Sequence, residues 1–257
     1  MLNSLYISAL GMQVQKTQLD VVSNNLANTN TAGYKRERVD FSAMLDRQAQ
    51  AGSNTSRHAG DPAVTVVRSP LHRDLSQGEL RATEAPLDVA INGTGLLEVR
   101  LSDDRVGYVR GGSLRINSDG YLTIASGELL KADIRVPANA SDINIDARGV
   151  VTAKLGGEAQ ATELGRLQLV SFTNADMLDY LGNGVFTAAE GQEVATRGNP
   201  EEEGLGSIAG RKLEMSNVKV VDEMVSLMLA QRVYELNSKV VQAADELMAM
   251  ANSLRRG

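Results

Sequence analysis

The chain has 257 residues, 42% of them hydrophobic, which suits one or two folded domains with cores of their own. Its net charge of −6 and pI near 5.1 argue against nucleic acid as a main partner, because phosphate binding needs a basic face. The absence of Cys excludes disulfides, thiolate catalysis and cysteine-based zinc sites.

The first 30 residues predict an amphipathic helix, from Asn3 to about Asn28, with one Gly and no Pro. Two apolar rows recur at intervals of seven and lie on more than one side of the helix, so the helix needs more than one neighbour. These residues lack the basic stretch and small-residue cleavage site of a secretory signal, so we expect any export to proceed without a cleaved signal. The sequence contains no run of 18 apolar residues, so it predicts no membrane span.

Residues 31–79 predict an extended arm that begins with a turn, in which Gly33 is suited to a positive φ angle. A short strand-like run occurs within the arm at residues 64–67. Residues 80–206 then alternate short apolar segments with turn sequences, which is typical of an antiparallel β domain. Residues 84–205 carry 10 Lys and Arg against 19 Asp and Glu, so this domain holds the negative charge.

Residues 207–257 predict a second helix, from about Ser216 to Leu254, roughly 60 Å long and capped by Ser216 or Asn217. One row follows a strict three-then-four spacing that is typical of a coiled-coil seam. A second apolar row, which recurs every seven residues, lies beside it. Covering this row would need neighbours in addition to the helix pair within one chain. The strict row consists of Val233, Leu236, Val240, Ala243, Leu247, Met250 and Leu254, and the second of Val220, Leu227, Tyr234, Val241 and Met248.

Candidate sites for chemistry are weak throughout the chain. The segment Asp142–Asp146 has the alternating oxygens of a calcium loop but lacks the required Gly and the bidentate Glu. Gly93-Thr94-Gly95 is too short for a phosphate loop and fits a hairpin. His58 and His72 have no triad partners at a recognisable spacing, and we expect them at the surface. We therefore predict no catalytic residue, cofactor or metal.

Three strings in the right order resemble the rod and hook proteins of the bacterial flagellum. The first is Asn24-Asn25-Leu26-Ala27-Asn28 with Gly33, Tyr34 and Lys35, and the last is Leu213-Glu214-Met215 with Ser216, Asn217 and Val218. Between them, residues 87–95 and 108–113 resemble the opening of the family's β domain. The length and layout resemble the distal rod protein most. Leu96-Leu97 in place of an aromatic pair and a short arm leave a proximal rod or hook-type subunit open.

The resemblance implies an α+β fold in which the N- and C-terminal helices pair as a coiled coil, with an extended arm and an inserted antiparallel all-β domain. It implies a helical homopolymer in the basal body that spans the periplasm, contacts other rod and hook subunits axially, lies within periplasmic and outer-membrane rings, and leaves the cell through the flagellar export apparatus. A wall-remodelling enzyme and a cytoplasmic coiled-coil adaptor are the rival hypotheses. The predicted subunit interface comprises Leu5, Met12, Leu19, Leu26, Leu227, Val233, Tyr234, Leu236, Val240, Leu247, Met250 and Leu254.

Overall fold

The computed structural model describes residues 2–39, 71–156, 160–173, 178–188 and 194–254, without the side chains of residues 2–10, 194, 195, 245, 247, 248 and 251–254. The strand-like run at residues 64–67 and His58 lie outside the described residues. The chain forms two compact units. The helical unit comprises Met1–Asn28, Arg36–Asp74 and Val218–Gly257, and the β unit comprises Thr29–Lys35 and Leu75–Asn217.

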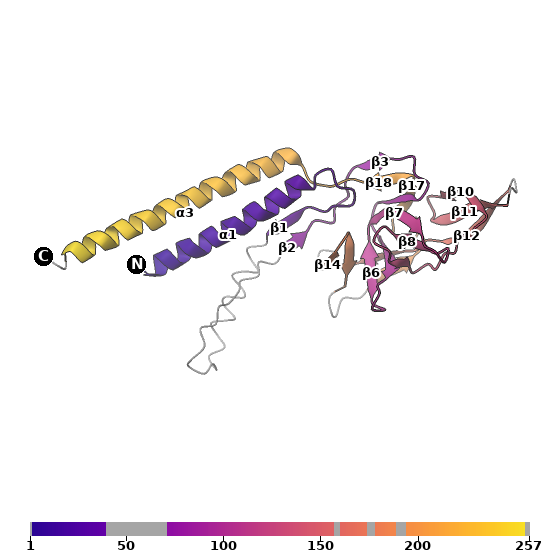
Figure 1. Ribbon diagram of the computed structural model, residues 1–257, viewed down its shortest axis with the longest axis horizontal. Coiled ribbons are helices and arrows are strands. Elements are labelled where there is room, and N and C mark those ends of the chain that lie inside the picture. The colour runs from indigo at the N-terminus through magenta and orange to yellow at the C-terminus, as the bar shows by residue number, and fades with distance from the viewer. Residues whose placement is uncertain (1, 40–70, 157–159, 174–177, 189–193, 255–257) are drawn as a thin grey trace, which may run out of the picture. The chain divides into compact units, whose positions relative to one another are not determined.

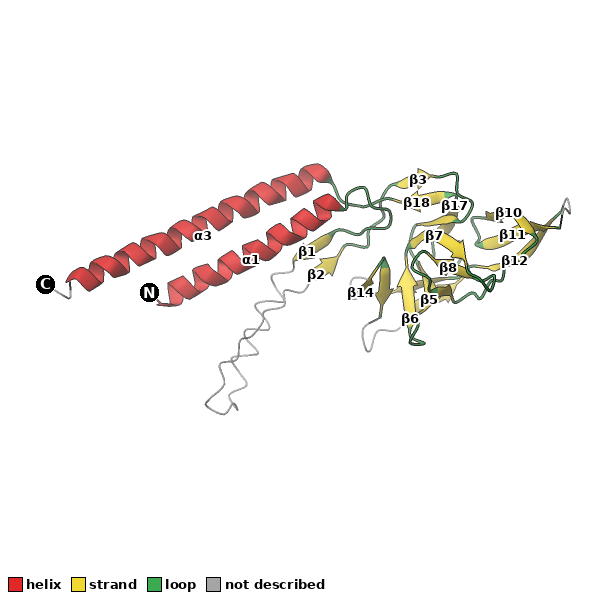
Figure 2. Cartoon of the chain, viewed as in Figure 1, coloured by secondary structure: helices red, strands yellow, loops and turns green. Residues whose placement is uncertain are grey.

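The elements follow one another as a helix, a long run of strands and a second helix (Figure 1). Figure 2 shows the helices in red and the strands in yellow. Their bounds are α1 (Leu2–Ala27), β1 (Glu37–Val39), β2 (Leu71–Arg73), β3 (Leu80–Ala82), β4 (Asp88–Asn92), β5 (Leu96–Arg100), β6 (Val106–Val109), β7 (Gly111–Ile116), β8 (Leu122–Ile124), β9 (Leu129–Leu130), β10 (Ala140–Ile145), β11 (Val150–Leu155), β12 (Ala161–Arg166), β13 (Leu169–Phe172), β14 (Asp179–Gly182), β15 (Val185–Thr187), β16 (Val194–Gly198), β17 (Ser207–Gly210), β18 (Lys212–Glu214) and α3 (Val220–Leu254).

In the helical unit, α1 and α3 lie side by side and run antiparallel (Figure 1). Two contacts define their register. A Cβ built on Gly11 would lie 3.0 Å from the amide nitrogen of Asn237, and Asn25 donates a 3.2 Å hydrogen bond to Glu223. Each helix advances by 14 residues between the two contacts (25 − 11 and 237 − 223), which is two heptads. The pair therefore keeps one register over this length.

The face that α3 turns toward α1 includes part of the second predicted row, although Val220 and Tyr234 of that row are exposed, and it does not include the strict row. Leu227 and Val241 are half-buried and Ala230 is buried, whereas the strict row is exposed wherever its side chains are described. The prediction that the strict row forms the seam between the two terminal helices is therefore wrong. The contacts that hold the pair together come from Glu223 and Asn237 of α3, which lie on a different side of the helix from the strict row.

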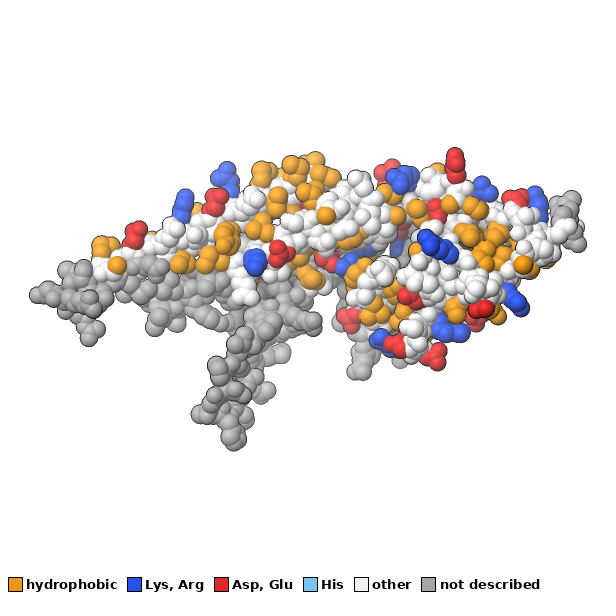
Figure 3. Space-filling view, viewed as in Figure 1, with side chains coloured by type: hydrophobic (Ala, Val, Ile, Leu, Met, Phe, Trp, Pro, Cys, Tyr) orange, Lys and Arg blue, Asp and Glu red, His pale blue; other side chains and the backbone are white. Residues whose placement is uncertain are grey.

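We give the name α3 stripe to seven of the exposed apolar residues of α3, from Val225 onward. Their side chains are 38–60% exposed, and Figure 3 shows orange side chains gathered over the first half of this helix. At 3.6 residues per turn they share one face. The α3 stripe consists of Val225, Met228, Leu229, Val233, Leu236, Val240 and Met250.

The β unit is built on a large antiparallel sheet in the order β14-β15-β6-β5-β9-β8-β7-β4-β17, with β13 pairing with β5 and β16. A smaller sheet, β10-β11-β12, and the pair β18-β3 complete the unit. The core is aliphatic, as the scarcity of aromatic residues requires: Val89, Ile91, Leu97 and Val99 are at most 1% exposed. A second cluster places Tyr108 edge-on to Phe172, with ring centroids 4.8 Å apart.

The predicted mixture of helices and antiparallel strands is confirmed, with shifts at the boundaries. α3 begins at Val220 and not at Ser216, and residues 207–217 belong to the β unit, where β17 pairs with β4. The described part of the predicted arm contains β1 and β2, which pair with each other. Within the described residues, no helix is long and apolar enough to cross a membrane.

Candidate functional site

The three sequence motifs meet in the β unit around one carboxylate, Glu214. This residue ends β18, whose pairing with β3 places Glu214 opposite Leu80. It is only 4% exposed, and a buried carboxylate is costly unless ion pairs and hydrogen bonds satisfy it. The backbone carbonyl of Glu214 also accepts a 2.7 Å hydrogen bond from the amide of Gly33 in the N-terminal motif.

Both oxygens of Glu214 are used. Oε1 lies 2.6 Å from the Lys35 ammonium and accepts a 2.7 Å hydrogen bond from the amide of Gly78. Oε2 accepts a 3.2 Å hydrogen bond from Nε of Arg110, in the middle motif. Lys35 is only 1% exposed and donates a second bond, of 2.7 Å, to the carbonyl of Ser76. One anion therefore joins two cations from separate parts of the chain, and we call these residues the Glu214 cluster: Lys35, Ser76, Gly78, Arg110 and Glu214.

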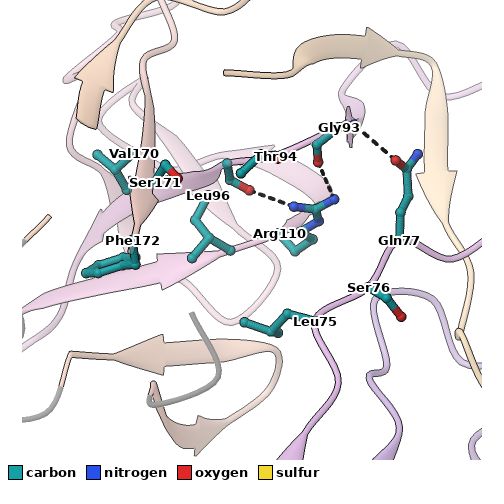
Figure 4. A pocket seen from close by; sticks show the side chains of 11 residues that line it. Leu75, Ser76, Gln77, Gly93, Thr94, Leu96, Arg110, Val170, Ser171 and Phe172 are labelled. Atoms are coloured by element: carbon teal, nitrogen blue, oxygen red, sulfur yellow. Dashed lines mark hydrogen bonds between the residues drawn. The ribbon is translucent and has the colours of Figure 1, made fainter. Parts of the chain in front are cut away.

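Arg110 also borders a groove of about 290 Å³ (Figure 4). Its guanidinium donates to the carbonyl oxygens of Gly93, at 2.5 Å, and Gly95, at 3.0 Å, so it clamps the turn between β4 and β5. Apolar side chains, among them Leu96 and Phe172, also line this groove. Because the charge of Arg110 is matched by Glu214 and its donors are directed at the protein, this arginine acts as a structural clamp.

A second buried glutamate lies in the helical unit. Glu223, in the first turn of α3, is 1% exposed, and its Oε1 lies 2.5 Å from Nε of Arg36. Asn25, in the last turns of α1, donates to Oε2 of Glu223 and to the carbonyl of Glu37, and accepts a 2.9 Å bond from the amide of Glu37. Arg73 of β2 forms an ion pair with the Glu37 side chain. Asn25 therefore joins both helices to β1, and we call these residues the Glu223 cluster: Asn25, Arg36, Glu37, Arg73 and Glu223.

The titratable groups whose pKa is shifted give no support to acid–base catalysis. Hydrogen bonding to the Arg105 guanidinium lowers the pKa of the exposed Asp103 carboxyl, and a hydrogen bond from Lys154 lowers that of Asp142. Burial raises the pKa of Tyr108, with a smaller contribution from the charge of Glu98. A wall-cutting enzyme needs a carboxyl group with a raised pKa, the opposite of the shifts at Asp103 and Asp142. Among the described residues, no three His, Asp or Glu side chains gather as metal ligands.

The remaining motif residues hold the backbone at the ends of the helices. The side-chain amide of Asn28 donates to both the backbone carbonyl and the side-chain oxygen of Asn24, each at 2.9 Å. Asn217 donates two 3.1 Å bonds to Ser76 and does not cap α3, which begins three residues later. Gly33 has φ of 73°, as predicted. Leu26, Tyr34 and Ser216 are half-buried, Val218 is buried and Ala27 is exposed.

The predicted interface residues divide into three groups. Met12, Leu19, Leu26 and Leu227 are half-buried within the helical unit. Val233, Tyr234, Leu236, Val240 and Met250 are exposed. The side chains of Leu5, Leu247 and Leu254 lie outside the described residues. Sequence reasoning missed Glu214 and Glu223 as structural centres. The sequence shows a Glu between Leu213 and Met215 in a strand-like segment. In a strand, alternate side chains point to opposite faces, and the pattern does not say which face is buried.

Comparisons with known proteins match these same regions. The model for the flagella basal body rod protein matches residues 5–35, the flagellar hook protein FlgE/F/G D1 domain matches residues 90–153, and the flagellar basal body rod FlgEFG protein C-terminal matches residues 210–254.

Proteins named flagellar basal-body rod protein FlgG are similar over their full length. The one from Caulobacter vibrioides is 34% identical over 99% of this chain and 100% of its own. The one from Buchnera aphidicola subsp. Acyrthosiphon pisum is 36% identical over 99% and 100%, and that from Borreliella burgdorferi is 34% identical over the whole of both chains. The chain therefore belongs to the FlgG family of flagellar basal-body rod proteins.

Proposed function

We propose that this chain is a structural subunit of the flagellar distal rod, and that it polymerises with its own copies through its terminal helices. The α3 stripe is the observation that supports polymerisation. Its seven apolar side chains lie on one face of a helix whose other face already packs on α1. Exposed apolar side chains that gather on one helix face are typical of a protein interface.

An open polymer needs a heterologous contact, in which the α3 stripe of one subunit meets a different surface of the next. An α3 stripe that met its own copy would instead close a dimer. The seven side chains are about half exposed, so covering them would contribute roughly 1 kcal/mol each, or about 5–10 kcal/mol together. Association costs about 4–15 kcal/mol in lost freedom. One such contact is therefore marginal, and contacts repeated around each subunit give a stable tube.

The remaining parts of the proposal rest on the resemblance and on charge. We propose that α1 and α3 form a coiled coil in the inner wall of the tube, that the β unit forms the outer layer, and that other rod and hook subunits adjoin the tube at its ends. The acidic β unit would face the enclosing periplasmic and outer-membrane rings without adhering to them. Passage through the flagellar export apparatus and a location across the periplasm belong to the same proposal.

The direct test is the position of the protein in purified basal bodies. We expect antibody against the chain to label the rod near the outer rings, and deletion of its gene to leave a rod that stops short. Label near the inner end of the rod would favour a proximal subunit. Absence of the protein from basal bodies that carry complete rods would overturn the proposal.

A further inference from the structure

Two buried glutamates lie on either side of the point where the chain passes from the β unit into the helical unit. That boundary falls between Asn217 and Val218. Glu214 lies before it and Glu223 after it, at 4% and 1% exposure. Each is held by a cation within its own unit, Lys35 for the first and Arg36 for the second.

Those two cations are consecutive residues, and the chain also crosses between the units at the bond that joins them. Lys35 is the last residue of a β-unit segment and Arg36 the first of a helical-unit segment. One dipeptide therefore supplies the counter-ion to both buried glutamates. Lys35 lies 2.6 Å from Glu214 and Arg36 lies 2.5 Å from Glu223. The ion pairs therefore bind the two crossings, at residues 35–36 and 217–218, to each other on both sides of the boundary.

A third crossing, between Asp74 and Leu75, is tied by the same residues. The backbone amide of Asp74 donates a 2.9 Å bond to the carbonyl of Arg36 in the helical unit. In the β unit, the carbonyl of Ser76 accepts the 2.7 Å bond from Lys35. Ser76 also accepts two bonds from Asn217. Three of the four crossings are thus fastened on both sides, and the fourth falls between Asn28 and Thr29.

We propose that the Glu214 and Glu223 clusters are paired anchors that confine bending of the linkage between the two units to the few residues between them. A buried ion pair contributes little net stability compared with an apolar pair, but loss of one partner leaves the other as an uncompensated charge, which is strongly destabilising. That these anchors carry load in a rotating rod rests on the proposed function. The confinement of bending does not depend on it.

Trypsin cleaves after Lys and Arg, and it reports opening of the Lys35–Arg36 segment directly, because proteolysis tracks the population of the open form. The experiment uses the full-length chain with Glu214→Gln, Glu223→Gln and the control Glu84→Gln, which changes an exposed glutamate of the β unit. Fragments that end at residues 35 and 36 are quantified by mass spectrometry over time. We expect cleavage after Arg36 to accelerate about tenfold or more in both anchor variants and to stay unchanged in the control.

Hydrogen exchange of the β4 and β5 amides shows whether the β unit remains folded. Should Glu214→Gln unfold it, Lys35→Met provides the same test, because Glu214 then remains neutralised by Arg110. Unchanged cleavage after Arg36 in the folded variants would overturn the proposal. Loss of core protection in both Glu214→Gln and Lys35→Met would overturn it too, since the cluster would then be part of the core. Neither result depends on whether the protein is found in basal bodies.

Discussion

Replacing Val240 with Asp tests whether the α3 stripe is an interface. Val240 is 51% exposed, so the free chain should lose little stability, within about 0.5 kcal/mol. In a polymer, the change would remove about 1 kcal/mol of apolar burial and leave a carboxylate that costs several kcal/mol to desolvate. A loss of at least about 3 kcal/mol per contact raises the concentration needed for assembly more than a hundredfold.

The matched control is Gln242→Asp, which introduces the same charge two residues away on the same helix. Gln242 is exposed and lies roughly 200° around the helix from Val240, outside the α3 stripe. We expect both variants to melt at the wild-type temperature by circular dichroism. In sedimentation and negative-stain microscopy, wild type and the control should form filaments, and Val240→Asp should remain monomeric.

Filaments of Val240→Asp at the wild-type concentration would refute the assignment of the α3 stripe to subunit contacts. Failure of both variants to assemble would point to net charge on the helix and not to the stripe. A large drop in the melting temperature of Val240→Asp alone would mean that this side chain packs within the free chain.

Three further predictions concern single residues of the two units. Asn25→Ala should lower the free energy of unfolding by about 1–3 kcal/mol in denaturant titrations, because buried backbone groups lose their partners. Gly78→Ala should unfold at lower temperature, because its Cβ would overlap the backbone carbonyl oxygen of Met215, which cannot move aside as a side chain can. The pKa of the Asp103 carboxyl, measured by NMR titration, should lie below 3.8 and return toward that value in Arg105→Gln. Because the pKa is lowered in the folded chain, the stabilising interaction is present above the pKa of the unfolded chain and is lost as the pH falls through the pKa of the folded chain.

Much of the local structure could be predicted because it depends on periodicity and turn chemistry. The absence of Pro and the sevenfold rows placed α1 within a residue or two of its observed ends. The alternation of short apolar segments and turn sequences over residues 80–206 predicted the antiparallel strands that the structure shows there, and Gly33 has the positive φ that its position in a turn suggested.

The burial of the two helix faces and of the glutamates could not be predicted from the same evidence. Two apolar rows on one helix both qualify as a seam, and periodicity does not say which of them meets the face of α1 that carries Gly11 and Asn25. Glu214 is buried because Lys35 and Arg110 reach it from positions 179 and 104 residues away. Long-range charge pairing leaves no periodic signal in a sequence.

The Glu214 cluster also constrains how these sequences can change over time. Because Lys35 and Arg110 share a single carboxylate, replacement of Glu214 alone leaves two buried cations unmatched, whereas replacement of one cation leaves a matched pair. Substitution at the cations should therefore precede substitution at the glutamate in any lineage that loses the cluster. The residues at these three positions, one in each motif, should therefore change together among relatives. A chimaera that joins the N-terminal part of one relative to the C-terminal part of a distant one should fail to fold where their charges at these positions do not match.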